Sequence, residues 1–102
     1  RGWLGVEIQE ITPQLAESFN LKGEKGIIIA GVLRDGPADK AGLEPGDIIT
    51  QLNGTAIDSA HAALNIIAQT APGDELKVTG LRNGKSLSLD VTVNERPQQS
   101  SR

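Results

Sequence analysis

Hydrophobic and polar residues alternate in three places along the chain, with the period of two that is typical of a strand with one buried face. The first run is LGVEIQ at 4–9, and the other two, at 76–78 and 87–93, flank the turn sequence RNGK at 82–85. These runs predict a strand near the start of the chain and a hairpin near its end. Gly5 interrupts the first run, although glycine loses the most backbone entropy of any residue and offers no side chain to pack.

Two other segments predict strands for different reasons. Residues 27–33, IIIAGVL, form a continuous and largely β-branched run, which is typical of a strand buried on both sides. Residues 47–52 follow the turn dipeptide Pro45-Gly46 and precede Asn53-Gly54, the strongest two-residue hairpin signal. The sequence therefore predicts a strand here, then a tight turn and a short return strand.

Helical spacing marks three further segments. Apolar residues recur at intervals of three and four over 59–71, which predicts one main amphipathic helix with Asp58 or Ser59 as its cap. Shorter helices are predicted over 12–20, where Thr12-Pro13 supplies a cap and a first-turn proline, and over 37–42. With five or six strands, these helices indicate an α+β domain, a small and partly open β-barrel or sandwich capped by the main helix.

Composition narrows the class of protein. The chain has 102 residues, enough for one domain, and no cysteine, which excludes disulfides and thiolate metal sites. Its 10 basic and 13 acidic residues are scattered, so nucleic acid is not an expected partner. No apolar stretch approaches the roughly 20 residues of a membrane helix, so direct membrane insertion is not expected. The first residue is not Met, which favours a piece of a longer protein.

Catalytic and cofactor chemistry find no support in the residues. The sequence has neither a G-x-S-x-G turn nor a phosphate-binding loop, and its single histidine is His61, for which a surface position is the simplest interpretation. The carboxylates stand singly in turns and caps, so no metal site is predicted. We therefore expect a non-catalytic domain without a metal or cofactor.

The segment DGPADKAGLEPGDIITQLNGTAI, at 35–57, resembles the most characteristic block of the PDZ family. The order of elements, with WLGV at the start and a closing hairpin at the end, is similar to the circularly permuted PDZ domains of bacterial proteases. Within these, RGWLGV, TPQLAESFNL and GIIIAGVLRDGPA resemble the HtrA/Deg periplasmic serine proteases. The resemblance implies a PDZ domain over 1–95, followed at 96–102 by a polar tail whose composition predicts disorder.

The resemblance also implies a binding site for the terminal carboxylate of a peptide. In PDZ domains, backbone amides of an x-Φ-G-Φ loop (Φ, hydrophobic) bind this group, and residues 3–6, WLGV, match the pattern. The predicted carboxylate-binding amides are therefore those of Leu4, Gly5 and Val6. Independently of the family, successive N–H groups that converge on one point form an anion site, and glycine lets the backbone turn closely enough.

By the same resemblance, the rest of the ligand pairs as an added strand with the open edge of 6–9 and lies against the helix at 59–71. The aliphatic side chains of these two segments could instead belong to an ordinary core, and the residues alone leave that alternative open. His61 lies near the position of the histidine that selects Ser or Thr in other PDZ domains, but the HtrA type usually lacks it and prefers hydrophobic C-termini. The predicted groove residues are Trp3, Glu7, Ile8, Leu64, Ile67 and Ala68, with Ala60 at the margin and Arg1 and His61 as auxiliary residues.

The resemblance implies a regulatory module. It would capture hydrophobic C-termini of unfolded or misfolded outer-membrane proteins, and so regulate or feed an attached trypsin-like protease. A periplasmic location and a trimeric parent follow from the same resemblance, and an inner-membrane anchor on the parent stays open. The alternative is a structural domain that holds subunits together without sensing free peptide.

Overall fold

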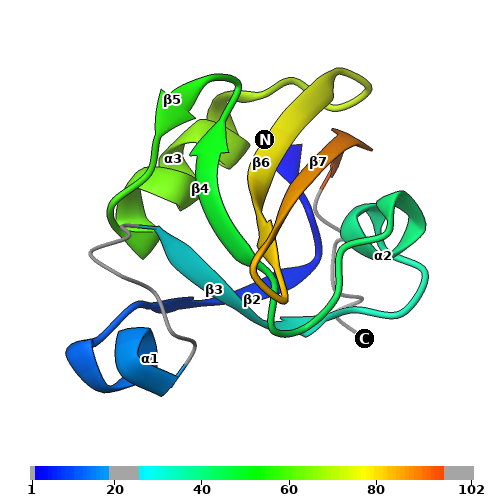
Figure 1. The fold of residues 1–102 in the computed structure, drawn as a ribbon. Helices are drawn as coiled ribbons and strands as arrows, with labels where there is room; N and C mark the ends of the chain where they lie inside the picture. The colour runs from blue at the N-terminus through cyan, green and yellow to red at the C-terminus, as the bar shows by residue number, and fades with distance from the viewer. Residues whose placement is uncertain (1, 19–25, 96–102) are drawn as a thin grey trace, which may run out of the picture.

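The computed structural model describes residues 2–18 and 26–95, and Figure 1 shows their arrangement. These residues form an open antiparallel sheet, a small two-stranded ribbon and three helices, in agreement with the predicted α+β class. The strands are β1 (Gly2–Trp3), β2 (Val6–Glu10), β3 (Ile27–Val32), β4 (Ile48–Leu52), β5 (Thr55–Ala56), β6 (Glu75–Arg82), β7 (Lys85–Thr92) and β8 (Asn94–Glu95). The helices are α1 (Pro13–Ser18), α2 (Pro37–Ala41) and α3 (Ala60–Gln69).

The sheet has the order β2-β3-β4-β6-β7, and β5 pairs with β4. The strand β2 lies at one edge of this order, so only β3 pairs with it among the described strands. Separately, β1 pairs with β8, with Gly2 opposite Glu95 and Trp3 opposite Asn94. The sequence predicted five or six strands and missed this ribbon, because two-residue strands are too short to show an alternating pattern.

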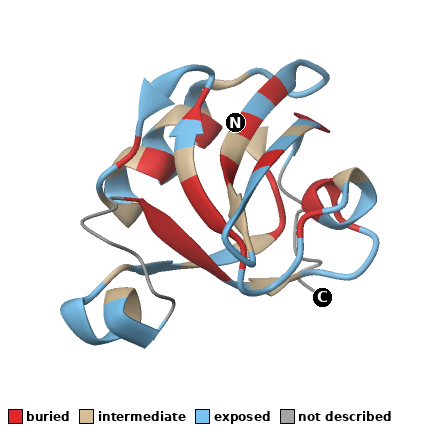
Figure 2. Cartoon of the chain, viewed as in Figure 1, coloured by how far each residue is buried: buried red, intermediate tan, exposed pale blue. Residues whose placement is uncertain are grey.

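The core lies between the sheet and the helices α2 and α3 and is aliphatic (Figure 2). All buried hydrophobic residues in the described part are Ile, Leu, Val or Ala. From α3 only Ala63 and Ile67 are buried, while α1 has no buried residue and lies at the periphery. Only a narrow stripe of α3, formed by these two residues, is therefore buried in the core, and the other faces of α3 stay accessible.

The prediction that the run at 27–33 is buried on both sides is only half right. Ile27, Ile28 and Ile29 are buried, but Ala30 is exposed and Val32 is half-buried. The physical reason is the register, because β3 pairs with β4 only at its first two residues. Ile29 still exchanges hydrogen bonds with Gly46 and Asp47 in the loop before β4. Beyond Ile29, β2 is the only strand that pairs with β3, so the second half of β3 forms surface.

The ends of the helices show which of the predicted caps form. The Ser59 hydroxyl accepts a hydrogen bond from the Ala62 amide at 3.0 Å, so Ser59 rather than Asp58 caps α3. Thr12 accepts from the Leu15 amide at 3.2 Å and caps α1 as predicted. Within the described ranges, no helix has the length and apolar character needed to cross a membrane.

Asp47, the only buried charged residue in the described part, anchors the loop before β4 to the end of β6. Its carboxylate accepts hydrogen bonds from Arg82 Nε at 2.8 Å, Arg82 Nη2 at 2.7 Å and the Glu44 amide at 2.9 Å. The hydrogen bond to Asp47 raises the pKa of Arg82 above its ordinary value. A buried polar group without a partner is costly, and the three bonds pair the buried Asp47 carboxylate. Together they hold the loop against the end of β6.

We expect Asp47→Ala to lower the melting temperature by about 10 °C, because it removes a buried acceptor together with the hydrogen bonds that it receives from Arg82 and the Glu44 amide. Thermal unfolding followed by circular dichroism measures the shift. Asp90→Ala is the matched control, since Asp90 is an exposed residue of β7. Equal melting temperatures for the two variants would contradict a structural role for the Asp47–Arg82 pair.

Candidate functional site

The loop between β1 and β2 consists of Leu4 and Gly5, so the strand that the alternating pattern predicted from residue 4 begins only at Val6, as β2. Gly5 has a φ of 74°, in the left-handed region that residues with a Cβ rarely adopt. A Cβ there would lie 3.2 Å from Cη2 of the Trp3 ring and 3.5 Å from Leu33 Cβ. Gly5 therefore lets the chain turn from β1 into β2 in a conformation that glycine adopts without strain.

Two hydrogen bonds fix the direction of the loop amides. The Leu4 carbonyl accepts from the Ala38 amide at 3.0 Å, and the Gly5 carbonyl accepts from the Leu33 amide at 2.9 Å. In a trans peptide the C=O and the following N–H point in opposite directions. The N–H groups of Gly5 and Val6 therefore point away from β3 and α2, toward the open edge of β2. These are two of the three amides predicted to bind a carboxylate.

A groove of about 380 Å³ lies between this loop and α3. Its floor is apolar and belongs to the core, since Leu4 and Ile67 are both buried. Leu64, by contrast, is 52% exposed, and Val6 is half-buried. The residues that line the groove are Gly2, Trp3, Leu4, Gly5, Val6, His61, Leu64, Asn65, Ile67 and Ala68.

The structure brings together most of the residues that the sequence singled out. The three residues predicted to bind the carboxylate, Leu4, Gly5 and Val6, all line the groove. So do Trp3, Leu64, Ile67, Ala68 and His61. Gly2 and Asn65 line it too and were not predicted. Asn65 could have been found by helical spacing, because it lies one turn after His61, whereas nothing in the sequence marks Gly2. Ala60 does not line the groove, and Arg1 lies outside the described residues.

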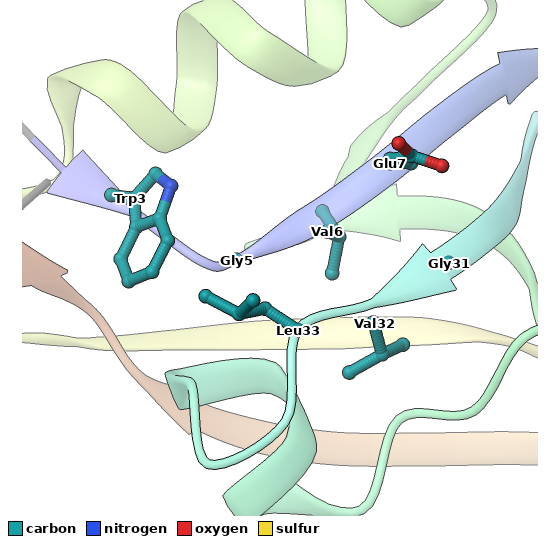
Figure 3. Close-up of a pocket in the computed structure, with 7 residues that line it drawn as sticks. All are labelled: Trp3, Gly5, Val6, Glu7, Gly31, Val32 and Leu33. Atoms are coloured by element: carbon teal, nitrogen blue, oxygen red, sulfur yellow. The ribbon is translucent and has the colours of Figure 1, made fainter.

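Glu7 and Ile8 do not line the groove. Ile8 packs against the hydrophobic core. Glu7 belongs to a second hollow of about 390 Å³ over β2 and β3, shown in Figure 3 with Trp3 and Leu33. Its side chain lies beside Gly31, where a Cβ would be 3.2 Å from Glu7 Oε1. Alternation along β2 therefore turns Glu7 to the face opposite Val6, whereas Ile8 shares the face of Val6 but lies further along the strand, over the core.

Gly2 sets how closely β1 approaches α3. A Cβ at Gly2 would collide with the carbonyl oxygens of Ile67 and Thr70, and would lie 2.8 Å from Val93 Cγ1. The backbone of β1 thus lies directly against the C-terminal end of α3, and the loop of Leu4 and Gly5 follows β1 without a break. Gly2 in this way fixes the position of the loop relative to the helix.

The polar chemistry of the groove is limited. In the described part of the chain, the His61 side chain has one hydrogen bond, 3.4 Å between its Nε2 and Asn65 Nδ2. Within the same residues no three His, Cys, Asp or Glu side chains are grouped so that they could hold a metal ion. What the groove offers a ligand is backbone N–H groups at one end and an apolar wall beside them.

Comparisons with known proteins agree with this geometry. A PDZ domain family model matches residues 2–93. A protein of Hahella chejuensis named probable periplasmic serine endoprotease DegP-like is 41% identical over 97 residues, which are 95% of this chain and 21% of that protein. The chain therefore spans about a fifth of the length of such relatives.

Solved structures give the same result. The HtrA-type protease AlgW with a decapeptide has a TM-score of 0.87 at 43% identity, over 97% of this chain and 30% of that one. The same protease with a tripeptide has a TM-score of 0.85 over 97% and 33%. The HtrA3 PDZ domain bound to the phage-derived ligand FGRWV shares the fold, with a TM-score of 0.79 at 21% identity over 92% and 86%. The chain therefore belongs to the PDZ domain family, in the branch found in HtrA-type serine proteases.

Proposed function

We propose that this domain binds the C-terminal residues of peptides in the groove between β2 and α3. The observation that carries the proposal is the direction of the Gly5 and Val6 amides, which point to the open edge of β2. Neighbouring N–H groups aimed at one point attract an anion, and the terminal carboxylate is the anion that every peptide carries. Leu4, the third predicted donor, begins the same loop.

The ligand extends the sheet as an additional strand. Because β2 is an edge strand, its free N–H and C=O groups are available for such pairing. The last side chain of the ligand then lies among Leu4, Val6, Leu64 and Ile67, which gives a preference for an apolar terminus. Burial of one such side chain contributes about 1.5 to 3 kcal/mol. With the carboxylate bonds this supports an affinity of about micromolar, near −8 kcal/mol.

The names of the relatives support a proposal about the wider role. They are named periplasmic serine endoproteases, and AlgW was solved with bound peptides. We propose that this domain captures hydrophobic C-termini of misfolded outer-membrane proteins in the periplasm. Capture regulates an attached trypsin-like protease in a trimeric parent, or delivers substrate to it. Regulation requires that the ligand bind two states of the whole enzyme with different affinity.

A comparison of free and amidated peptides tests the site. We expect pentapeptides that end in Val, Leu, Ile or Phe, FGRWV among them, to bind as free acids. Their C-terminal amides should bind about ten- to a hundredfold more weakly, because the charge-assisted bonds to the loop are lost. Titration calorimetry gives both affinities.

Two outcomes would contradict the proposal. Equal binding of acid and amide would mean that the loop amides do not hold the carboxylate. Absence of binding by every free acid would favour the alternative, an assembly domain that contacts a neighbouring subunit.

A further inference from the structure

A single side-chain hydrogen bond joins the two walls of the groove in the described residues. Glu10, the last residue of β2, accepts a hydrogen bond at its Oε2 from the amide of Ala60, the first residue of α3, at 2.9 Å. The two residues are 50 positions apart in the chain. The bond therefore depends on the tertiary structure and joins the edge strand directly to the groove helix.

The bond lies at the end of the groove opposite the carboxylate loop. Gly2 lies against the C-terminal end of α3, through Ile67 and Thr70, whereas Glu10 lies against its first residue. The chain from Gly2 to Glu10 thus runs along α3 from one end of the helix to the other. The two walls of the groove are therefore joined at both ends. Backbone packing joins them at the loop, and the Glu10 carboxylate joins them at the other end.

The chemistry of the Ala60 amide makes this contact effective. The first N–H groups of a helix have no partner within the helix, and a negative charge beside them is favourable. The Ser59 cap is used on Ala62, at 3.0 Å, and Glu10 provides the acceptor for Ala60. Two residues from different parts of the chain therefore satisfy two free donors, and only the bond from Glu10 links the helix to β2.

We propose that Glu10 is a positioning residue of the binding groove, which holds the start of α3 at a fixed distance from β2 and so keeps the groove ready for a ligand. The inference rests on the proposed function. A ligand antiparallel to β2, with its carboxylate at the loop, has its last three residues beside Val6–Ile8 and reaches Glu10 only with its fifth. A tripeptide therefore never touches Glu10, whereas a decapeptide passes it.

This difference in length separates positioning from direct contact. If Glu10 acts through α3, its removal weakens a tripeptide and a decapeptide alike. If it acts by touching the ligand, its removal changes the decapeptide alone. The probes are RWV and the decapeptide GSGSGFGRWV, which share the same three terminal residues.

The variants are Glu10→Ala, Glu10→Gln and the control Glu75→Ala, which removes the same charge from an exposed position on β6. We expect Glu10→Ala to bind both peptides about fivefold more weakly, because the free energy that a helix loses with one capping bond corresponds to about this ratio of affinities. Hydrogen exchange of the Ala60 amide should become faster in the same variant. Glu10→Gln keeps an acceptor oxygen and should recover most of the affinity, and Glu75→Ala should match the wild type.

Three results would overturn the inference: a loss confined to the decapeptide, unchanged affinities despite faster Ala60 exchange, or an unchanged exchange rate in Glu10→Ala. If the wild-type domain binds neither peptide, the proposed function fails. The exchange rate of Ala60 still shows, independently, whether Glu10 anchors α3.

Discussion

We expect Leu64→Glu to weaken peptide binding by at least about a hundredfold and to leave the domain folded. Leu64 lines the groove and is 52% exposed, so it contributes to the ligand wall and little to the core. The substitution removes apolar contact with the last ligand side chain and places a negative charge near its carboxylate. Glutamate is a good helix former, so α3 should persist. Fluorescence anisotropy with a labelled peptide measures the affinity, and circular dichroism measures the fold.

Ser88→Glu is a control for the added charge in this variant. Ser88 is exposed on β7, which lies at the opposite edge of the sheet from β2, and it does not line the groove. We expect it to bind peptide as the wild type does. Leu64→Gln separates the two causes, because it removes the apolar contact without adding a charge. Wild-type affinity in Leu64→Glu would show that the ligand does not lie against α3.

Gly2→Ala should both destabilise the domain and weaken binding. The added methyl group has no room, because backbone carbonyls of Ile67 and Thr70 occupy its position. Backbone atoms of a packed helix cannot swing aside as a side chain can, so β1 must move away from α3, with a cost of about 3 kcal/mol in the free energy of unfolding. The carboxylate loop moves with β1, and we expect at least a tenfold loss of affinity. Urea unfolding and peptide titration measure the two effects.

Gly31→Ala is the corresponding control. A Cβ at Gly31 meets the end of the flexible Glu7 side chain, at 3.2 Å, rather than backbone. Its free energy of unfolding should change by less than about 0.5 kcal/mol. A Gly2→Ala variant as stable as Gly31→Ala would mean that β1 does not need its close approach to α3.

The sequence by itself determined the features that depend on neighbouring residues. Alternation over 4–9 and 87–93 predicted strands, and helical spacing with a nearby cap predicted α3. The WLGV motif located the loop through its resemblance to the x-Φ-G-Φ pattern of PDZ domains, a match within four residues that needs no tertiary contact. These signals are local, since dihedral preferences and side-chain periods act over a few residues.

Tertiary structure alone decided the features that join distant residues. The carbonyl bonds from Leu4 and Gly5 to residues near 33–38 turn the amides toward the groove. The register of β3 leaves half of that strand at the surface, and the bond from Glu10 to Ala60 joins the groove walls. No pattern within one segment of the chain encodes a contact with another segment. The distance between two such segments is fixed only when both pack on the same core. The sequence therefore predicted where a peptide could be held, and the packing of β1, β2 and α3 determined the geometry of the groove.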